Sequence, residues 1–416
     1  MARKVLVLGY GVSGKASAAL LKKQGAEVVV ADRKEGIDTG GVPFFLDWAD
    51  LPLDGIDQVI LSPGVSPEHP IVVRARGLGI EVVGEAEFAM RQVGNRCVGI
   101  TGTNGKTTVT LLVAHVLNSV GLKANAVGNM GSALTEQALK GGDEILVVEL
   151  SSFQLETMVA KRLEAAVYLN MTPDHLDRYG SMWDYAAAKA RIQDCLVDGG
   201  RLFVSKQVMS EYGDLFHRPV EIFDAMEESV APFERLRYIQ LGVPEQQNVK
   251  AAFALCSVFG VSSEQFQKSL ATFRKPPHRI EWLGEKNGVH YYNDSKATNI
   301  DSVMYAIALF EGPIVLIAGG VDKGASYAPW IESFRGKVRA IVAYGEAAPK
   351  MESELAGHFV FKRVDRMAEA VAWAKGEAKG QEIVLLSPGC SSYDQFRSYA
   401  HRGDEFKRLV EEFSNG

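Results

Sequence analysis

Cysteine is scarce in this chain of 416 residues, and its 4 cysteines are spread too widely to form a CxxC pair. They are Cys97, Cys195, Cys256 and Cys390. Such spacing argues against a zinc ribbon or a disulfide framework and fits a protein of the reducing cytoplasm. The N-terminal apolar run is too short for a signal peptide, and no stretch reaches the ~18 apolar residues of a membrane span. We expect a cytoplasmic protein with no membrane partner.

Positive charge is not in excess. The chain has 45 Lys and Arg against 51 Asp and Glu, a net charge of -6, so no general positive field attracts a polyanion and nucleic acid is not an expected partner. The hydrophobic fraction of 47% and the charged fraction of 23% are typical of a folded globular protein and exclude a disordered or collagenous chain. At about 150 residues per domain, the length indicates about three domains.

Short apolar runs of strand length recur between longer helix-like segments, which is typical of parallel sheets buried on both faces. The runs lie at 5–9, 28–32, 58–64, 97–102, 144–150, 165–172, 313–320, 339–345 and 382–389. Two breaks interrupt this pattern: a polar turn at Gly94 and Asn95, and the segment RKPPHR at 274–279, whose prolines cannot continue a helix. We therefore predict three α/β domains, with Rossmann-like first and last domains and a P-loop ATPase-like central domain. Their predicted ranges are 1–93, 94–276 and 277–416.

The first strand runs into the sequence GYGVSG, in which Gly9, Gly11 and Gly14 form a GxGxxG pattern at the start of a helix. The next strand ends at Asp32, about where a ribose-binding acid would lie. The glycines allow a diphosphate to approach the N–H groups and positive dipole end of the helix. They do not specify the ligand: a nicotinamide or flavin dinucleotide fits, another nucleotide diphosphate such as a UDP-sugar fits equally, and some such loops only pack a helix on a strand.

A second glycine-rich loop, within GITGTNGKTTVT at 99–110, follows a buried strand and leads into a helix. Backbone N–H groups of such a loop can surround phosphates, Lys106 can bridge the β and γ oxygens, and the Thr107 hydroxyl can bind Mg²⁺. The sequence departs from the GxxxxGK[ST] pattern, because Ile100 stands where the first glycine would be. The strand, glycines, lysine and hydroxyls together predict ATP binding.

Charged side chains follow the neighbouring strands. Glu149 ends the strand at 144–150, where an acid of a P-loop domain typically serves the metal. Asp174 and His175 follow the strand at 165–172, and Lys189 lies on a helix rich in alanine. A single His or Lys is more often structural or solvated than functional, and a packing role for Lys189 remains open.

The last domain has several polar segments, and three of them follow strands. The segments are HRIEW at 278–282, YYNDSKATN at 291–299, AGGVDKGASY at 318–327 and LLSPGCSSYDQFRSYAHRGDEF at 385–406. Their side chains should gather at one edge of the sheet, and hydroxyls together with Lys323 suit a carboxylate ligand. Helix capping is the alternative explanation, since Asp, Ser, Thr and Asn are good N-cap residues.

Taken in chain order, these segments resemble the Mur ligases of peptidoglycan synthesis over essentially the whole chain. The matching segments include TGTNGKTT, GNMG, ELSSFQLE, NMTPDHLDRYGSM, AAKARI, HRIE, NDSKATN and SPGCSSYDQF. ELSSFQLE and NDSKATN are the segments most specific to the family member that adds D-glutamate, and the DNPR-type signature of the diaminopimelate-adding members is not present in the sequence. The resemblance implies a monomeric, ATP-dependent amide ligase of cell-wall synthesis, and hence of cell shape and division.

The implied reaction joins D-glutamate to UDP-N-acetylmuramoyl-L-alanine (UDP-MurNAc-L-Ala) through an acyl phosphate, releasing ADP and phosphate. The resemblance implies that the UDP-substrate is bound by Val12, Ser13, Asp32, Arg33, Ser62, Gly64 and Asn129. It implies that ATP is bound by Gly102, Thr103, Asn104, Gly105, Lys106, Thr107, Thr108, Asn248, Arg279 and Asp294. It implies that D-glutamate is bound by Lys296, Thr298, Lys323, Ser392 and Tyr399.

The resemblance also implies two Mg²⁺ ions, one on Thr107 and Glu149 and one on His175 and Lys189. Lys189 would be carbamylated, and Lys106, His175 and Lys189 would be the catalytic residues. Closure of the last domain over ATP would use a hinge at 274–279.

Two departures from the family pattern stand out. Gln247 and Ala251 replace a His and an Asn that often accompany Asn248, which puts the adenine contacts in doubt, and Tyr399 stands where Phe is usual. Three other functions stay open: another amide ligase, either a different Mur ligase or a folylpolyglutamate synthase; an NAD-dependent oxidoreductase; and a nucleotide-binding switch.

Overall fold

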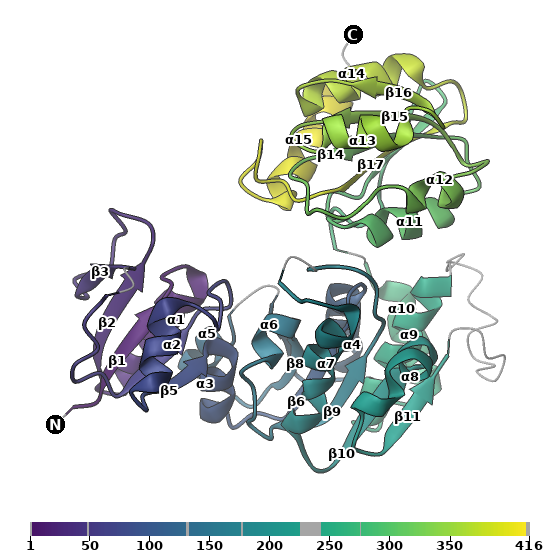
Figure 1. Ribbon diagram of the computed structural model, residues 1–416. Helices are drawn as coiled ribbons and strands as arrows, with labels where there is room; N and C mark the ends of the chain where they lie inside the picture. The colour runs from purple at the N-terminus through teal and green to yellow at the C-terminus, as the bar shows by residue number, and fades with distance from the viewer. Residues whose placement is uncertain are drawn as a thin grey trace. The chain divides into compact units, whose positions relative to one another are not determined.

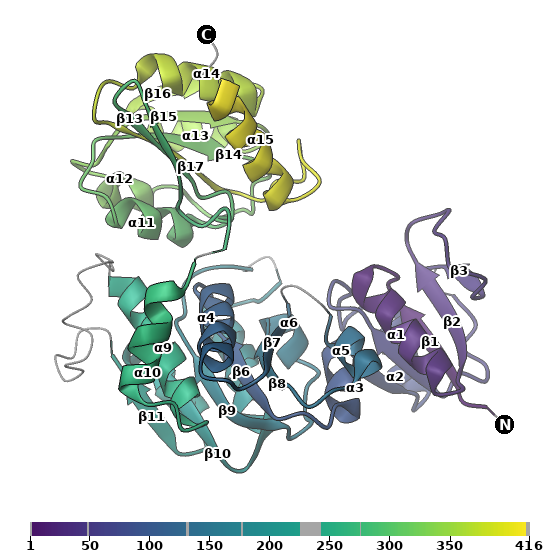
Figure 2. The same ribbon diagram turned by 180° about the vertical axis from the view of Figure 1, so that it is seen from behind.

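The computed structural model describes residues 2–47, 50–129, 133–175, 178–224, 243–274 and 276–412. Within these ranges the chain forms three sheets, of 5, 6 and 6 strands, packed with helices (Figures 1 and 2). This confirms the predicted three-domain α/β architecture. No helix in the described ranges has the length and apolar character needed to cross a membrane.

The first sheet is parallel throughout and has the order β3-β2-β1-β4-β5. Its strands are β1 (Lys4–Leu8), β2 (Glu27–Asp32), β3 (Phe44–Leu46), β4 (Gln58–Leu61) and β5 (Glu81–Gly84), and its helices are α1 (Val12–Lys23), α2 (Pro70–Gly77) and α3 (Glu85–Gln92). Alternate residues of β1 enter two cores: Val5 and Val7 pack with α1 and α3, and Leu6 and Leu8 pack with α2. The strand order reverses beside β1, so the GYGVSG loop lies at the switch point where α/β sheets bind ligands.

The second sheet is also parallel, with the order β11-β10-β9-β6-β8-β7. Its strands are β6 (Cys97–Thr101), β7 (Ala124–Gly128), β8 (Ile145–Glu149), β9 (Leu163–Tyr168), β10 (Leu196–Ser205) and β11 (Val220–Phe223). The helices between and after these strands are α4 (Lys106–Ser119), α5 (Leu134–Lys140), α6 (Ser152–Leu155), α7 (Met182–Ala190), α8 (Lys206–Tyr212), α9 (Val243–Ser257) and α10 (Ser263–Thr272), with short 3-10 turns at Arg191–Cys195 and Gly213–Leu215. Of these, α5 packs on α1 and α3 of the first sheet. All residues of the central strand β6 are buried, as its continuous apolar run predicts.

The third sheet has the order β12-β13-β17-β14-β15-β16, and only the β12–β13 pair is antiparallel among its described strands. The strands are β12 (Glu281–Lys286), β13 (Val289–Asn293), β14 (Ile314–Gly319), β15 (Val338–Tyr344), β16 (Val360–Arg363) and β17 (Ile383–Gly389). The helices are α11 (Ile300–Ala308), α12 (Pro329–Ser333), α13 (Ala348–Leu355), α14 (Met367–Glu377) and α15 (Tyr399–Glu412). One face of the sheet packs on α11, α12 and α13, and the other packs on α14 and α15.

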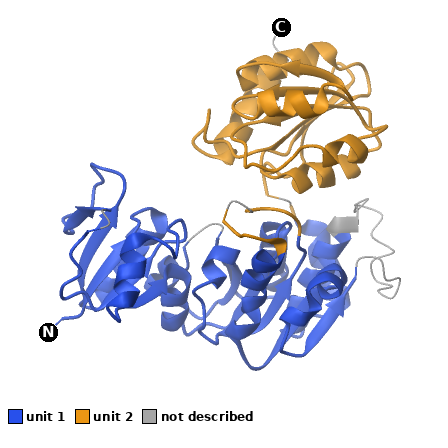
Figure 3. Ribbon diagram, viewed as in Figure 1, with its two compact units in different colours: residues 1–171, 183–238, 245–273 blue, residues 172–182, 239–244, 274–416 orange. Residues whose placement is uncertain are grey.

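The contacts within the chain define two compact units (Figure 3). The first unit, 1–171, 183–238 and 245–273, holds the first two sheets, and the second unit, 172–182, 239–244 and 274–416, holds the third sheet and the segment after Met171. The predicted boundaries at 93/94 and 276/277 stay predictions. Of the expected hinge at 274–279, Lys275 lies outside the described residues.

Two buried acids of α3 join the first sheet to elements of the second. The Glu85 carboxylate accepts hydrogen bonds from the backbone N–H (3.1 Å) and the hydroxyl (2.7 Å) of Thr135 at the start of α5. The Glu87 carboxylate accepts from the N–H groups of Val159 (2.8 Å) and Ala160 (2.9 Å). Side-chain carboxylates therefore satisfy backbone donors at this junction, where the two sheets belong to one unit.

Burial raises the pKa of Glu85 despite the hydrogen bonds from Thr135. The folded state thus binds this proton more tightly than the unfolded state, so the contribution to stability is complete below the unfolded pKa of about 4.3 and declines as pH rises through the folded pKa. Glu85→Gln keeps an oxygen that can accept from Thr135. Because glutamine does not lose a proton, the stability of this variant does not decline in the same way as pH rises. We expect it to gain stability over the wild type between pH 5 and pH 8, by about 1.4 kcal/mol for each unit of pKa difference.

Urea unfolding midpoints at the two pH values measure this gain. Glu27→Gln, which changes an exposed acid of β2 with 57% side-chain exposure, is the control. Parallel pH dependences for Glu85→Gln and the wild type would contradict the prediction.

Candidate active site

The glycine-rich loop at 102–105, called the phosphate loop below, joins β6 to α4, as its sequence predicts. Gly105 caps α4 in a left-handed conformation with φ 84°, and a Cβ on it would lie 2.2 Å from Oδ1 of Asn248 on α9. Only glycine fits this position without displacing Asn248. The Asn104 N–H donates to Oδ1 of Asn170 (2.8 Å), and the Asn170 amide donates back to the Asn104 carbonyl (3.0 Å). Asn170, which the sequence did not single out, therefore holds the loop in place.

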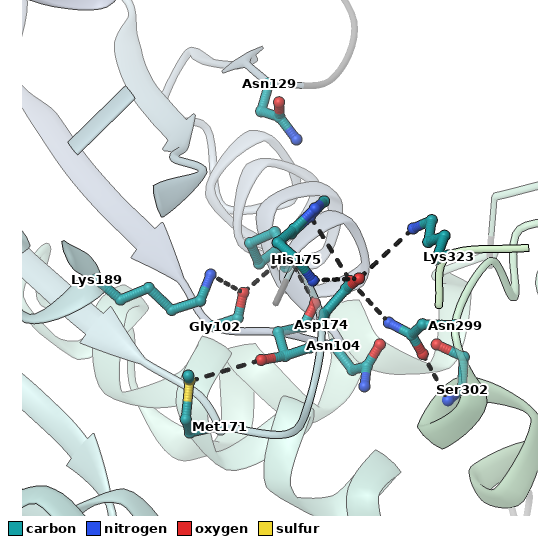
Figure 4. A network of polar contacts seen from close by, with 12 residues as sticks. Gly102, Asn104, Asn129, Met171, Asp174, His175, Lys189, Asn299, Ser302 and Lys323 are labelled. Carbon is teal, nitrogen blue, oxygen red and sulfur yellow. Dashed lines mark hydrogen bonds and ion pairs between the residues drawn. The ribbon is translucent and has the colours of Figure 1, made fainter. Parts of the chain in front are cut away.

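Two lysines converge on one carbonyl of this loop, that of Gly102, and Figure 4 shows the bond from Lys189. Nζ of Lys106 donates to the carbonyls of Gly102 (2.8 Å) and Thr103 (2.8 Å), and Nζ of Lys189 donates to the same Gly102 carbonyl (2.9 Å). Lys189 is 1% exposed, and its ammonium lies 4.5 Å from the centre of the Tyr185 ring. The ammonium of Lys106 places a positive charge on this loop, which suits an anion such as a triphosphate.

Glu149 ends β8, whose register places it beside Ile100 of β6. Its side chain is buried, Oε1 accepts a hydrogen bond from Asn129 Nδ2 (3.0 Å), and Oε2 has no hydrogen-bond partner among the described residues. A buried carboxylate oxygen without a donor is costly, and a divalent cation is a fitting partner for it. Thr107 is buried in the first turn of α4, directly after the phosphate loop.

Among the described residues, no group of three or more His, Cys, Asp or Glu side chains could hold a metal ion by itself. Mg²⁺ does not need such a group, because it keeps several waters and is bound through one or two protein groups and substrate phosphates. Glu149 and Thr107 therefore fit one such ion. The second predicted pair combines His175 and Lys189, which belong to different units, and its assignment stays a prediction.

In the second unit, Asp174 is the centre of a polar network (Figure 4). Its Oδ1 accepts from the His175 N–H (3.0 Å) and pairs with Nζ of Lys323 (3.5 Å), and its Oδ2 accepts from Nδ2 of Asn299 (3.0 Å). Asn299 in turn caps α11 by accepting from the Ser302 N–H (2.8 Å). The network lines a cavity of about 270 Å³, which presents a cation, a carboxylate and an imidazole to a small polar ligand.

Other predicted amino-acid-binding residues lie on neighbouring segments of this unit. Nζ of Lys296 lies 3.8 Å from the centre of the Tyr399 ring, so these two predicted residues are in contact. Thr298 is half-buried and Ser392 is buried. The structure thus brings Lys296 to Tyr399, and Lys323 to Asp174, while the roles predicted for these residues remain predictions.

Of the predicted adenine and ribose contacts in this unit, Asp294 already has protein partners. Its Oδ1 accepts from the Ile280 N–H (3.3 Å) and its Oδ2 from the Ser387 hydroxyl (2.8 Å). Asp294 is buried, whereas Arg279 is half-buried. Asp294 therefore orders the end of β13, and a nucleotide contact by Asp294 stays a prediction.

The GYGVSG loop of the first sheet is a tight turn fixed by hydrogen bonds. Oδ2 of Asp32 accepts from the Tyr10 N–H (2.6 Å), the Ser62 hydroxyl donates to the Gly9 carbonyl (2.7 Å), and a Cβ on Gly14 would lie 2.0 Å from that carbonyl oxygen. Asp32 and Ser62 therefore shape the turn. Val12, Arg33 and Gly64 are exposed and Ser13 is half-buried, so these residues are available to a ligand.

Comparison with known proteins places this geometry in a family. Residues 3–84 match the MurD-like N-terminal domain of Mur ligases, residues 100–217 match the Mur ligase middle domain, and residues 278–390 match the glutamate ligase domain of Mur ligases. The UDP-N-acetylmuramoylalanine--D-glutamate ligase of Protochlamydia amoebophila is 42% identical, with 98% of each chain covered. That of Desulfitobacterium hafniense strain DCB-2 is 37% identical, covering 98% of this chain and 97% of the relative.

Solved structures show the same fold at low identity. The MurF ligase of Thermotoga maritima, in complex with ADP, superposes with a TM-score of 0.60 at 17% identity, covering 100% of this chain and 95% of that chain. The UDP-N-acetylmuramate-alanine ligase MurC of the same organism has a TM-score of 0.59 at 19% identity, covering 99% of both chains. Since the sequence similarity extends along the whole chain and includes all three domain types, the chain belongs to the Mur ligase family.

Proposed function

We propose that this protein is an ATP-dependent ligase that adds D-glutamate to UDP-MurNAc-L-Ala in peptidoglycan synthesis. The observation that carries the proposal is 42% identity over nearly the full length to a D-glutamate ligase, in a chain that keeps two lysines on the phosphate loop and an unpartnered buried oxygen of Glu149. The enzyme acts as a cytoplasmic monomer. Its substrates are ATP, the UDP-sugar peptide precursor and D-glutamate.

The reaction proceeds in two steps. First, the L-alanyl carboxylate attacks the γ-phosphorus of ATP, which forms an acyl phosphate and releases ADP. The uncharged amino group of D-glutamate then attacks the acyl carbon, loses a proton, and expels phosphate as the amide bond forms. Both reactants of the first step are anions, so stabilising their combined charge is the main catalytic requirement.

Lys106 meets this requirement by exchanging partners. Its ammonium now donates to the carbonyls of Gly102 and Thr103, and phosphate oxygens of ATP replace these neutral acceptors with charged ones. Glu149 and Thr107 would hold one Mg²⁺, which neutralises charge on the triphosphate when bound. His175 and Lys189 would hold a second.

Lys189 is carbamylated in the active enzyme. Its amine is buried and shares an acceptor with the ammonium of Lys106, and both burial and a neighbouring cation favour the uncharged amine. The uncharged nitrogen attacks the carbon of CO₂ and loses a proton, which gives a carbamate anion. A negative group there would interact favourably with Mg²⁺ and with Lys106.

Lys189→Ala is expected to lose most activity, about 100-fold or more, because the carbamate is lost. Short carboxylic acids such as acetate or propionate should restore part of the activity, since they supply an anion to the vacated space. Phosphate release with and without added acid measures the rescue. Lys161→Ala, at an exposed lysine of the same unit, is the control that should show neither loss nor rescue. Equal rates with and without acid would contradict the carbamate assignment.

Phosphate release assayed with ATP, UDP-MurNAc-L-Ala and one amino acid at a time tests the proposed function. D-glutamate should support turnover, and L-glutamate, L-lysine and diaminopimelate should not. Turnover with diaminopimelate or L-lysine would identify another Mur ligase activity. Absence of phosphate release with every amino acid would overturn the ligase assignment.

A further inference from the structure

Arg402 of α15 is a fully buried cation in the second unit, with 0% exposure. Its Nε donates to the hydroxyl of Ser295 (3.0 Å), its Nη2 to the carbonyl of Ser295 (2.8 Å), and its Nη1 to the carbonyl of Cys390 (3.1 Å). Longer bonds from Nη1 reach the carbonyls of Ser391 (3.4 Å) and Gly319 (3.5 Å). Each of these acceptors is a neutral oxygen.

The acceptors lie on three segments, each just before a residue predicted to bind D-glutamate. Ser295 precedes Lys296, Gly319 ends β14 before the loop with Lys323, and Ser391 precedes Ser392. Two of these segments are also joined directly, because the Val321 N–H donates to the Ser391 carbonyl (3.0 Å). One guanidinium therefore connects the three segments that would bind the amino acid.

The helix that carries Arg402 belongs to the same arrangement. α15 begins at Tyr399, another predicted D-glutamate residue, and the Tyr399 carbonyl accepts from the Ser295 hydroxyl (2.8 Å). Gly320 packs closely on this arrangement, since a Cβ on it would lie 3.2 Å from Nη1 of Arg402 and 2.1 Å from the Ser391 carbonyl oxygen. Small displacements of Arg402 would therefore be transmitted to the neighbouring loops.

Burying a guanidinium on neutral acceptors is expensive. The effective penalty for a buried ion is several kcal/mol, and well-packed uncharged residues often serve stability equally well or better. A ligand with negative charge offsets this penalty, and D-glutamate brings two carboxylates. A dicarboxylic amino acid held by these segments would therefore be favoured by the positive charge of Arg402.

From these contacts we infer that Arg402 is the positioning residue of the amino-acid site. Its guanidinium aligns the segments that carry Lys296, Lys323 and Ser392, and its charge favours a dicarboxylic amino acid without touching it. This inference rests on the proposed function for the identity of the amino acid.

The test is Arg402→Lys, which keeps the charge and removes the planar set of donors that reaches several acceptors. KM for D-glutamate should rise about 10-fold, the effect of losing 1.4 kcal/mol of binding, while KM for ATP stays within about 2-fold. A purely structural role would lower the fraction of folded enzyme and hence kcat, and it would leave KM for D-glutamate unchanged. An unchanged KM for D-glutamate, or equal increases in both KM values, would overturn the inference.

Two further variants keep the test decisive. Arg408→Lys changes an exposed arginine of α15 that pairs with Glu405, and it should behave as the wild type. Ser295→Ala removes the hydroxyl between Arg402 and Tyr399. It should also raise KM for D-glutamate, by a smaller factor than Arg402→Lys does. If Arg402→Lys does not fold, an unchanged KM in Ser295→Ala overturns the inference.

Amide hydrogen exchange separates this inference from the proposed function. Segments 294–299, 319–324 and 389–392 should exchange faster in Arg402→Lys than in Arg408→Lys, whichever amino acid is the substrate. Faster exchange together with a wild type that is inactive on D-glutamate would support the positioning role and overturn the proposed substrate. Equal exchange in the two variants would overturn the positioning role even if the wild type uses D-glutamate.

Discussion

Lys106→Ala is expected to reduce ADP formation by about 10²- to 10³-fold, the loss typical when one group that stabilises transition-state charge is removed. Lys106 is the first residue of α4, and its ammonium already lies within 2.8 Å of two carbonyl oxygens of the phosphate loop. A water molecule that fills the space left by the lysine side chain carries no net charge, so it cannot replace the ammonium. The expected loss therefore falls on kcat, because the charge matters most when the carboxylate meets the γ-phosphate.

Lys123→Ala is the matched control for this variant. Lys123 follows the same helix, but its side chain is 75% exposed and its ion pair with Asp143, at 3.9 Å, is loose. Thermal unfolding of both variants establishes that the fold is intact. Normal turnover by folded Lys106→Ala would show that the phosphate loop does not bind the reacting phosphates, and the active-site assignment would then be wrong.

The sequence predicted the architecture of the phosphate loop because its signals are local. A buried strand, glycines and a helix start follow one another within 97–110, and the structure has β6, the loop and α4 in these places. Glu149 was predictable for a related reason, since an acid at the end of one parallel strand lies beside the end of its neighbour. Predictions of this kind need only the strand direction and the order of elements.

The residues that hold the loop were harder to predict. Asn170 contacts Asn104 across 66 positions of sequence, and nothing in the spelling of the segment LNMT indicates that its asparagine faces the phosphate loop. Its place just after β9, the strand beside β6, is a signal that could have suggested it. The β12–β13 hairpin also had a signal, because Asn287-Gly288 is a favoured hairpin turn.

The burial of Arg402 could not be predicted from the sequence. It lies in a helix with many charged residues, and an arginine in such a helix is normally solvated. Its burial depends on three segments that precede it by up to 107 positions and that meet only in the folded sheet. The domain boundaries have the same difficulty, since the segment 172–182 makes its contacts with a unit that is distant in sequence.

Glu149→Gln is the second variant with a large expected effect, a fall in kcat of about 10²- to 10³-fold. The glutamine oxygen can still accept the hydrogen bond from Asn129, so the shape of the site is kept while the negative charge is lost. What changes is the partner offered to a cation, because the unpartnered Oε2 becomes an amide group that cannot ligate Mg²⁺ as an anion. The effect should therefore appear in metal binding as well as in turnover.

Binding of Mn²⁺ in the presence of ADP, titrated by electron paramagnetic resonance, measures the metal affinity without turnover. We expect Glu149→Gln to bind Mn²⁺ at least about 10-fold more weakly, a loss of 1.4 kcal/mol or more. Asp143→Asn is the control, because Asp143 lies near the opposite end of β8 with its side chain 86% exposed. If Glu149→Gln and Asp143→Asn bind Mn²⁺ equally well, the unpartnered oxygen of Glu149 has another purpose, and the metal must be held elsewhere in the chain.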